Sequence, residues 1–491
     1  MNEAAKENLE NVARRPECMV MKFGGTSVED ATAMWRVTQL VKRRLRHRPV
    51  VVVSALAKVT DQLVHAGKAA AEGQSEFAAQ MLQQLRERHQ TVARELVQGE
   101  LYDQLWAELL GAFQVVEELL RSIAGAGEFT PRLQDRLLGM GEVFSSRILH
   151  AALLCAGFDA AWVDPKDCIV TDAAHTRATP LWEETNERLE AVLLPLLAAG
   201  RVPLLGGFVG ATRDGVPTTL GRGGSDFSAA IVGAGLHASR IEIWTDVDGV
   251  MTADPGLCAG ALRVTSMSFH EAAELAYFGA KVLHPSTLAP AMRHDIPVWV
   301  LNSRNPEGGG TEIVAHARDG GQVKAITAKR GIAVVDVEPV RWLAPELLRE
   351  VFEVFARHQQ NLDLLSASRG SLSLLVTSTA ALPAIAEELK GMAHVRWENH
   401  KALVCLVGEN IRRRPEIASQ AFHAISDIEM RMICQGASER NISFLVDESR
   451  AEEAVRRLHD LLFLTQSSRL PATPAVSSPQ AMCQAAGGTW N

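Results

Sequence analysis

The sequence lacks the features that mark several large classes of protein. Its seven cysteines are dispersed and include no CxxC pair, which argues against a disulfide framework or a zinc site and favours reduced thiols. The first residues are too polar for a signal core, and no run of about eighteen apolar residues is available to span a bilayer. Fifty basic residues against 58 acidic ones give a formal charge of −8, which disfavours a general nucleic-acid binder. We therefore expect a cytoplasmic protein without membrane or nucleic-acid partners.

Two common nucleotide-binding patterns are also missing. The sequence has no GxxxxGK[ST] run, which excludes a Walker-type phosphate loop. It has no GxGxxG run that opens a βαβ unit, which speaks against a dinucleotide-binding fold. A phosphate site in this chain must therefore be built from other residues.

The chain is long enough for two or three domains, with 491 residues of which 47% are hydrophobic. From Met19 to about Ala317, near-continuous apolar runs alternate with amphipathic helices, which predicts a parallel sheet covered on both faces. The clearest predicted strands are 50–53, 202–205, 241–244 and 298–301. Residues 75–120 predict a helical layer over this sheet.

After Thr327 the sequence changes to shorter units that occur twice. A strand at 331–337 precedes a helix, two strands and a helix, and the same order restarts at 402–408, which is 402 − 331 = 71 residues later. This repeat predicts two βαββα(β) units in tandem. The predicted organisation is a flexible leader (1–17), a large α/β domain (18–318), two repeated units (319–398 and 399–466) and a disordered tail (467–491).

The first segment that suggests chemistry is Lys22-Phe23-Gly24-Gly25-Thr26-Ser27, at the end of an apolar strand. Glycines without a Cβ allow backbone amides to approach an anion, and Lys22 adds a positive charge. A glycine pair after a strand also occurs in ordinary tight turns. This segment is informative only in combination with others.

A second segment, Gly221 to Asp226, places Arg222 among three glycines and suits recognition of a carboxylate. Asp226 lies near the start of a predicted helix, where an N-cap role explains it equally well. A third segment, Thr245 to Gly249, follows a strand at the edge where α/β sheets bind ligands, but it also fits a plain Asp-Gly turn.

The fourth segment, Phe278 to Pro285, would present Lys281 to a nucleotide, although a surface lysine needs no such role. Two shorter stretches are Gly141-Glu142 in a helical region and Ser54 to Thr60 after the second strand. Each of these reads equally well as a helix surface or a polar loop.

Taken together, these motifs resemble those of the aspartokinases, members of the amino-acid kinase family. The resemblance runs from about Met19 to Phe463, and the segment 431–438 is similar to the second regulatory ACT unit of that family. It implies an α/β fold: a three-layer αβα sandwich with a mainly parallel sheet, followed by two ACT-like α+β units of βαββαβ order. The form implied is the single-function, lysine-sensitive type, because no homoserine dehydrogenase follows residue 463.

The resemblance implies transfer of the γ-phosphoryl group of ATP, with Mg²⁺, to the side-chain carboxylate of L-aspartate. This reaction leads towards lysine, threonine and methionine. Lys22 would stabilise the transferring phosphoryl group, and Asp226 would organise the site by holding Lys22. Arg222 would bind the α-carboxylate of aspartate and Glu142 its ammonium group.

The remaining implied contacts are of three kinds. Further substrate contacts would be Ser54, Thr60, Gly223 and Ser225. Nucleotide contacts would be Lys22, Gly24, Gly25, Thr245, Asp246 and Lys281. An amino-acid effector would meet Asp363 and Ser368. The resemblance assigns no residue to a metal ion. The ACT units imply a homodimer or larger assembly.

Two other functions remain open from the sequence. Another amino-acid kinase could act on glutamate or carbamate, although the pairing of Arg222 with Glu142 favours an α-amino acid over carbamate. A catalytically silent amino-acid sensor is a second alternative, against which the intact Lys22, Arg222 and Asp226 argue.

The sequence also departs from the family at two places. Met251 and Gly256 stand where relatives carry an aromatic residue and an arginine near the adenine and phosphates, and the sequence leaves their effect on nucleotide affinity or preference open. In the first ACT-like unit, Arg369 replaces a glutamate that is usual in lysine-sensitive relatives.

We predict weak or absent inhibition by lysine, or a different effector, because the Arg369 guanidinium would repel a lysine side chain. The measurement is a lysine titration of the purified enzyme. Strong inhibition at sub-millimolar lysine would contradict this prediction.

Overall fold

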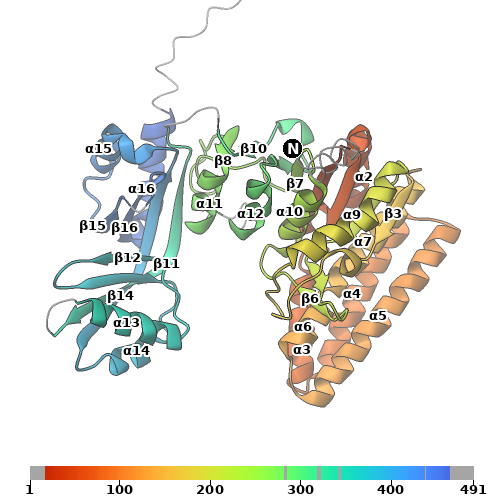
Figure 1. Cartoon of the computed structure of the whole chain (residues 1–491), viewed down its shortest axis with the longest axis horizontal. Helices are drawn as coiled ribbons and strands as arrows, with labels where there is room; N and C mark the ends of the chain where they lie inside the picture. The colour runs from red at the N-terminus through yellow and green to blue at the C-terminus, as the bar shows by residue number, and fades with distance from the viewer. Residues whose placement is uncertain (1–16, 281–284, 318–321, 341–343, 437, 465–491) are drawn as a thin grey trace, which may run out of the picture.

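The computed structural model describes residues 17–280, 285–317, 322–340, 344–436 and 438–464. Two bodies lie side by side, an α/β domain built from the amino-terminal part of the chain and a smaller carboxyl-terminal body around a second sheet (Figure 1). Helices α11 (Phe269–Tyr277) and α12 (Pro285–Arg293) lie between the two sheets in this view. The expected leader before residue 17 and the tail from 467 lie outside the described residues.

Within the described residues, the first domain is organised by an eight-stranded sheet in the order β3-β4-β2-β1-β7-β9-β10-β8. Neighbouring strands are parallel except for the antiparallel pair β9–β10. The strands are β1 (Met19–Phe23), β2 (Pro49–Val53), β3 (Ala160–Val163), β4 (Val202–Gly206), β7 (Ile241–Thr245), β8 (Ser266–Ser268), β9 (Val298–Asn302) and β10 (Thr311–Val314). The mainly parallel sheet and its four clearest predicted strands are confirmed.

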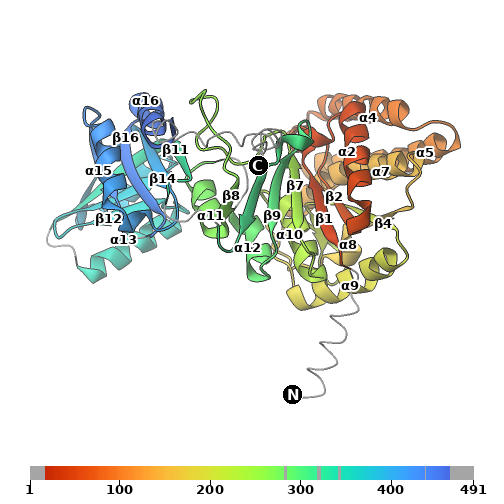
Figure 2. The same cartoon turned by 90° about the horizontal axis from the view of Figure 1, so that it is seen from above.

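Helices cover both faces of this sheet, as Figure 2 shows. One layer contains α2 (Ala31–Arg44), α3 (Val59–Ala71), α4 (Ser75–Leu96), α5 (Glu100–Ala126), α6 (Pro131–Leu138) and α7 (Met140–Cys155). The other contains α8 (Pro165–Cys168), α9 (Trp182–Ala198), α10 (Gly224–Leu236), α11 and α12. The predicted helical layer at 75–120 corresponds to α4 and α5.

Each sheet face has its own hydrophobic core because side chains alternate along a strand. Met19, Met21 and Phe23 of β1 are buried against the layer that contains α2 and α7, whereas Val20 is buried on the face covered by α10. A short hairpin, β5 (Val209–Ala211) and β6 (Pro217–Thr219), follows β4 and leads towards α10.

One stretch of this domain, 131–155, has the length and apolar composition of a membrane span. It consists of α6 and α7, and 72% of its most apolar window is buried inside the protein. Its packing against the sheet and α5 accounts for its apolar character.

In the second body, the described strands form one six-stranded antiparallel sheet in the order β12-β13-β11-β14-β16-β15. Its central strands, β11 (Ala325–Pro339) and β14 (Ala393–Val407), are long and pair along most of their length. The other elements are α13 (Pro345–Arg357), β12 (Leu364–Ala367), β13 (Leu372–Val376), α14 (Leu382–Glu388), α15 (Pro415–Ala424), β15 (Met430–Cys434), β16 (Asn441–Asp447) and α16 (Glu448–His459). The predicted repeat of strand, helix, two strands and helix is present.

The two repeated units share strands. Residues 325–329 at the start of β11 pair with 403–407 at the end of β14, which in turn pairs with β16 of the second unit. The later part of β11 pairs with β13 of the first unit. Strand β14 therefore continues across the expected boundary at 398/399, and a single sheet serves both units.

Candidate active site

The end of β1 places Lys22 against the first turn of α10. Lys22 is 7% exposed, and its Nζ lies 2.6 Å from Oδ1 of Asp226. The N-cap of α10 is Gly223, so Asp226 is a residue of the first helical turn rather than an N-cap. A buried ammonium group needs such a partner because burial without one is costly. The prediction that Asp226 holds Lys22 agrees with this contact.

The glycine turn after Lys22 is tied to the neighbouring strand. The Gly24 amide donates to the Trp244 carbonyl at 2.9 Å, so this amide is already engaged and cannot also face a phosphate without rearrangement. A Cβ on Gly24 would lie 3.6 Å from Lys22 Nζ, and one on Gly25 would lie 3.1 Å from the Ala55 carbonyl oxygen. A Cβ on Gly24 would thus be in ordinary contact distance, whereas one on Gly25 would crowd the Ala55 carbonyl, and backbone contacts to an anion would begin at Gly25.

A cavity of about 380 Å³ opens beside this ion pair. Its walls come from the ends of β1 and β2, from α3 and α7, and from the loop that enters α10. The expected residues that line it are Lys22, Gly25, Ser54, Thr60, Glu142, Arg222, Gly223, Ser225 and Asp226. Residues separated by about two hundred positions in sequence thus meet at one edge of the parallel sheet, where α/β proteins bind ligands.

Glu142, in the first turn of α7, contributes a buried carboxylate to this cavity. The residue is 4% exposed, and its Oε2 atom has no hydrogen-bond partner in the described part of the chain. Burial raises the pKa of Glu142 from 4.5 to about 8, against the smaller opposing effects of a backbone hydrogen bond at Ala55 and the charge of Lys22. A buried carboxyl group with one unpaired oxygen suits a cationic ligand.

The loop that carries Arg222 has a backbone that only glycine adopts readily. Gly221 and Gly223 have φ angles of 78° and 72°. A Cβ on Gly224 would lie only 2.5 Å from the ring of Phe208. Gly221 and Gly223 allow the loop to place Arg222 at the cavity that Glu142 also lines.

A second, larger cavity of about 830 Å³ lies next to the loop after β7. Asp246, Gly249 and Met251 line it together with Gly279 and Ala280 of the fourth sequence segment. Strand β11 of the second sheet forms its other side. The third and fourth segments are therefore brought together, whereas Lys281 lies outside the described residues. Thr245 adjoins Asp246, to which its hydroxyl donates at 3.2 Å.

The sequence matches the amino acid kinase family over residues 17–302 and an ACT domain over residues 404–462. It is 35% identical to the lysine-sensitive aspartokinase 3 of Escherichia coli over 91% of this chain and 99% of that protein. It is 36% identical to the chloroplastic aspartokinase 3 of Arabidopsis thaliana, over 91% of this chain and 82% of the relative.

The chain belongs to the aspartokinases.

Solved structures of this family agree in fold. The crystal structure of E. coli aspartokinase III in complex with aspartate and ADP (R-state) matches with a TM-score of 0.80, at 35% identity, and covers 91% of this chain and 100% of that one. The same enzyme in complex with lysine and aspartate (T-state) matches with a TM-score of 0.77, over 91% and 99%. The αβα domain and the ACT units implied by the resemblance are confirmed.

Three aspartokinase cavity residues were missed by the sequence analysis. Lys58, Asp61 and Phe208 all line the smaller cavity. Phe208 follows Gly206-Gly207 at the carboxyl end of β4 and has a positive φ of 68°. A glycine pair at the end of a predicted parallel strand was the available signal for Phe208. Lys58 lies within the stretch Ser54 to Thr60 that was singled out from the sequence, although no role was assigned to it, and Asp61 just after this stretch carried no signal of its own.

The two expected effector residues lie in the first ACT unit but differ in their contacts and exposure. Asp363 accepts an ion pair from Lys329 Nζ at 2.7 Å, and its carbonyl accepts from the Tyr277 hydroxyl at 2.8 Å. Ser368 lies in the exposed turn between β12 and β13, where its hydroxyl accepts from the amide of Ser371. An effector that binds Asp363 would meet a carboxylate whose Oδ1 is paired with Lys329 and whose Oδ2 has no hydrogen-bond partner among the described residues.

The raised pKa of Glu142 predicts a pH-dependent contribution to stability. The folded protein binds this proton more tightly than the unfolded chain, so the contribution is fully present below pH 4.5 and is lost as pH rises towards about 8. A Glu142→Gln variant has no such titration. We expect the melting temperature of the wild type to fall relative to that of Glu142→Gln between about pH 5 and about pH 9. If the melting temperatures of the two proteins changed in parallel with pH across this range, the raised pKa of Glu142 would be contradicted.

Proposed function

We propose that this aspartokinase is catalytically active and phosphorylates the side-chain carboxylate of L-aspartate with ATP. The observation that carries the proposal is the meeting of four side chains at one cavity: the Lys22–Asp226 ion pair, Arg222, and the buried carboxyl of Glu142, whose Oε2 atom has no hydrogen-bond partner among the described residues. The relative crystallised with aspartate and ADP supports this choice of ligands.

The arrangement suits an amino acid with two carboxylates. Arg222 can pair with the α-carboxylate through two parallel hydrogen bonds, and Glu142 in its ionised form can pair with the ammonium group. Both ends of the substrate backbone are then fixed, and the side-chain carboxylate is left to face Lys22. Hydroxyls of Ser54, Thr60 and Ser225 line the same cavity and can complete the hydrogen bonds.

The chemistry requires charge neutralisation rather than proton removal. The attacking carboxylate is already ionised at neutral pH, and the obstacle is its approach to a polyanionic phosphate chain. Lys22 would stabilise the charge of the transferring phosphoryl group, while its contact with Asp226 fixes the direction of its ammonium. Lys22 lines the smaller cavity, so the terminal phosphate of the nucleotide would have to reach into this cavity for Lys22 to meet both reactants.

The nucleotide would occupy the larger cavity, with Thr245 and Asp246 on one side and the segment that carries Lys281 on another. Mg²⁺ would arrive with ATP and offset phosphate charge through phosphate oxygens and water. The described residues contain no group of three or more His, Cys, Asp or Glu side chains placed to hold a metal ion. A site made mainly by the nucleotide fits that arrangement.

Regulation and assembly complete the proposal. The edge strands β12 and β15 of the second sheet carry the exposed residues Leu365 and Ile433, at 51% and 50% exposure. Open edges of this kind pair readily with another chain, which supports a homodimer through the ACT units. An amino-acid effector would bind the first ACT unit near Asp363 and Ser368.

A cytoplasmic location agrees with the six free cysteines among the described residues.

Purified enzyme assayed with L-aspartate, ATP and hydroxylamine should yield aspartyl hydroxamate, because hydroxylamine attacks the acyl phosphate and releases inorganic phosphate. L-Glutamate should give little product. The Lys22→Ala variant should fold but lose at least about a hundredfold in turnover, equivalent to about 2.7 kcal/mol of transition-state stabilisation. Lys68→Ala, which removes an exposed lysine at the end of α3, is the matched control and should retain full activity.

Three results would count against this function. Near-normal turnover in Lys22→Ala would show that the site is misassigned. A preference for glutamate would indicate a different amino-acid kinase. Absence of turnover with any acidic amino acid in a folded protein that still binds aspartate would favour a silent sensor.

A further inference from the structure

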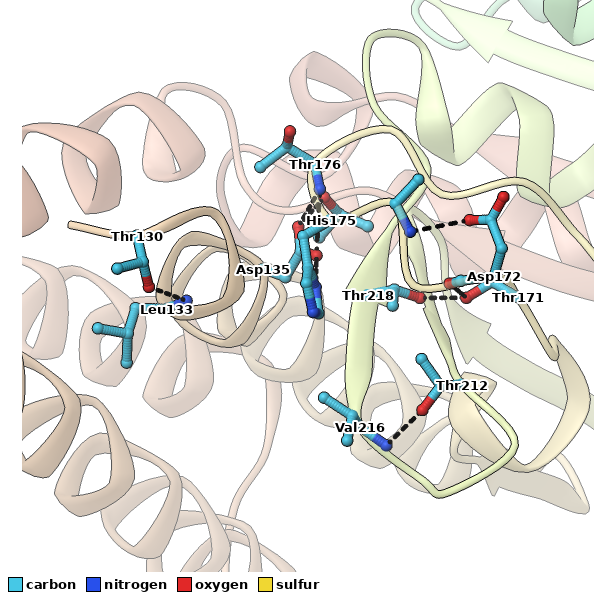
Figure 3. Close-up of polar contacts among 12 residues, drawn as sticks. Thr130, Leu133, Asp135, Thr171, Asp172, His175, Thr176, Thr212, Val216 and Thr218 are labelled. Atoms are coloured by element: carbon cyan, nitrogen blue, oxygen red, sulfur yellow. Dashed lines mark hydrogen bonds and ion pairs between the residues drawn. The ribbon is translucent and has the colours of Figure 1, made fainter.

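Asp135 is a buried carboxylate that lies outside the cavity and has no role in the reaction described above. It belongs to α6 and is 1% exposed. Its oxygens accept from His175 Nδ1 at 2.6 Å, from the Thr176 amide at 2.9 and 3.1 Å, and from the Thr219 hydroxyl. Figure 3 shows Asp135 between α6 and the loop that carries His175 and Thr176. Every partner of this carboxylate comes from another segment of the chain.

One of those segments leads directly to Arg222. Thr219 ends β6, three residues before Arg222, and its carbonyl accepts from the Ala178 amide at 2.9 Å. Gly221 then passes so close to the 175–178 loop that a Cβ there would lie 3.1 Å from the Thr176 carbonyl oxygen. The start of the Arg222 loop therefore rests on residues that Asp135 holds.

The 175–178 loop, on which the start of the Arg222 loop rests, contains a residue in an unusual backbone conformation. Thr176 has a φ of 69°, which is rare for a β-branched residue and requires compensation from its surroundings. The Asp135 carboxylate supplies this compensation by accepting the Thr176 amide with both oxygens. Without that acceptor, the backbone at Thr176 would tend to return to a common conformation. The Thr176 carbonyl that lies against Gly221 would then move.

On the other side, Asp135 is joined to Glu142 by continuous helical backbone. The Gly139 amide donates to the Asp135 carbonyl at 3.1 Å, and Gly139 is also the N-cap of α7, which contains Glu142 in its first turn. A Cβ on Gly139 would lie 2.9 Å from the Val209 side chain in β5. The α6–α7 junction and the β5–β6 hairpin are thus packed closely together.

We propose that Asp135 is a positioning residue that sets the spacing between Arg222 and Glu142 and so selects an α-amino acid. The inference rests on the proposed function, in which these two groups hold the carboxylate and ammonium of the substrate. The two charged groups of an α-amino acid are held on one carbon, so a small shift of the Arg222 loop misaligns both contacts together.

This role predicts a defect confined to the amino-acid substrate. The nucleotide segments after β7 and α11 have no hydrogen bond to Asp135 among the described contacts. Loosening the Asp135 cluster should therefore raise the KM for L-aspartate and leave the KM for ATP in place. A general loss of folding would instead lower the active fraction without changing either KM.

The sharpest test is Thr219→Val, which removes one hydroxyl bonded to Asp135 and keeps the side-chain shape. Its matched control is Thr212→Val in the same hairpin, where the hydroxyl accepts only the Val216 turn amide (Figure 3). We expect Thr219→Val to raise the KM for L-aspartate about fivefold, with kcat and the KM for ATP within about twofold of wild type. Thr212→Val should leave all three parameters within about twofold of wild type.

A second variant, Asp135→Asn, keeps the size of the side chain but removes one acceptor, and should raise the KM for L-aspartate about tenfold or more. Direct binding of L-aspartate by calorimetry should weaken by the same factor in each variant. Should Asp135→Asn fail to fold, Thr219→Val decides alone.

The inference is overturned if Thr219→Val keeps the wild-type KM for aspartate, raises the KM for ATP equally, or behaves as Thr212→Val does. These results would leave the proposed function intact, because wild-type turnover would stand. A wild-type protein that neither turns over nor binds L-aspartate would overturn both proposals, which separates the two kinds of failure.

Discussion

The ion pair between Lys22 and Asp226 is the constraint on which the rest of the active site depends. A lysine at the end of a central parallel strand is buried on nearly every side, and such an ammonium is tolerated only beside an anion. Asp226 can supply this anion only if the first turn of α10 lies directly beside the end of β1. The loop that enters α10 also carries Arg222, so the position of this arginine, which the proposed function assigns to the substrate carboxylate, depends on the same packing.

Helix α11, which immediately precedes the segment expected to meet the nucleotide, contacts both units of the second sheet. Its Glu274 accepts from Ser438 and Asn441 of the second ACT unit, at 2.7 Å each. Its Tyr277 donates to the Asp363 carbonyl of the first unit. Since both units hold the same helix and share strands β11 and β14, a displacement within either unit would be transmitted to the same end of the larger cavity. Lys329, which pairs with Asp363 and lines that cavity, belongs to this connection.

Much of the architecture was predictable because it depends on local patterns. Continuous apolar runs identified the central strands. The change to shorter predicted elements after Thr327 identified a second type of fold, and the spacing of the repeat identified two related units. The grouping of Lys22 with Arg222 and Glu142 was also expected, but it depended on the family resemblance, because each motif read alone had an ordinary structural alternative. The sharing of β11 and β14 between units was not expected, since strand pairing over about seventy residues leaves no local signal.

Periodicity and glycine content are properties of the local chain, so the fold class, the glycine-lined segments and the residue types that meet at the cavity were accessible before folding was considered. The ion pair that Asp226 makes in place of a helix cap, the contact of Asp363 with Lys329 and the link that Asp135 makes between three segments became visible only in the folded protein. These roles depend on which distant backbone lies within hydrogen-bonding distance. That proximity is fixed by packing of the whole domain, which no short stretch of sequence specifies.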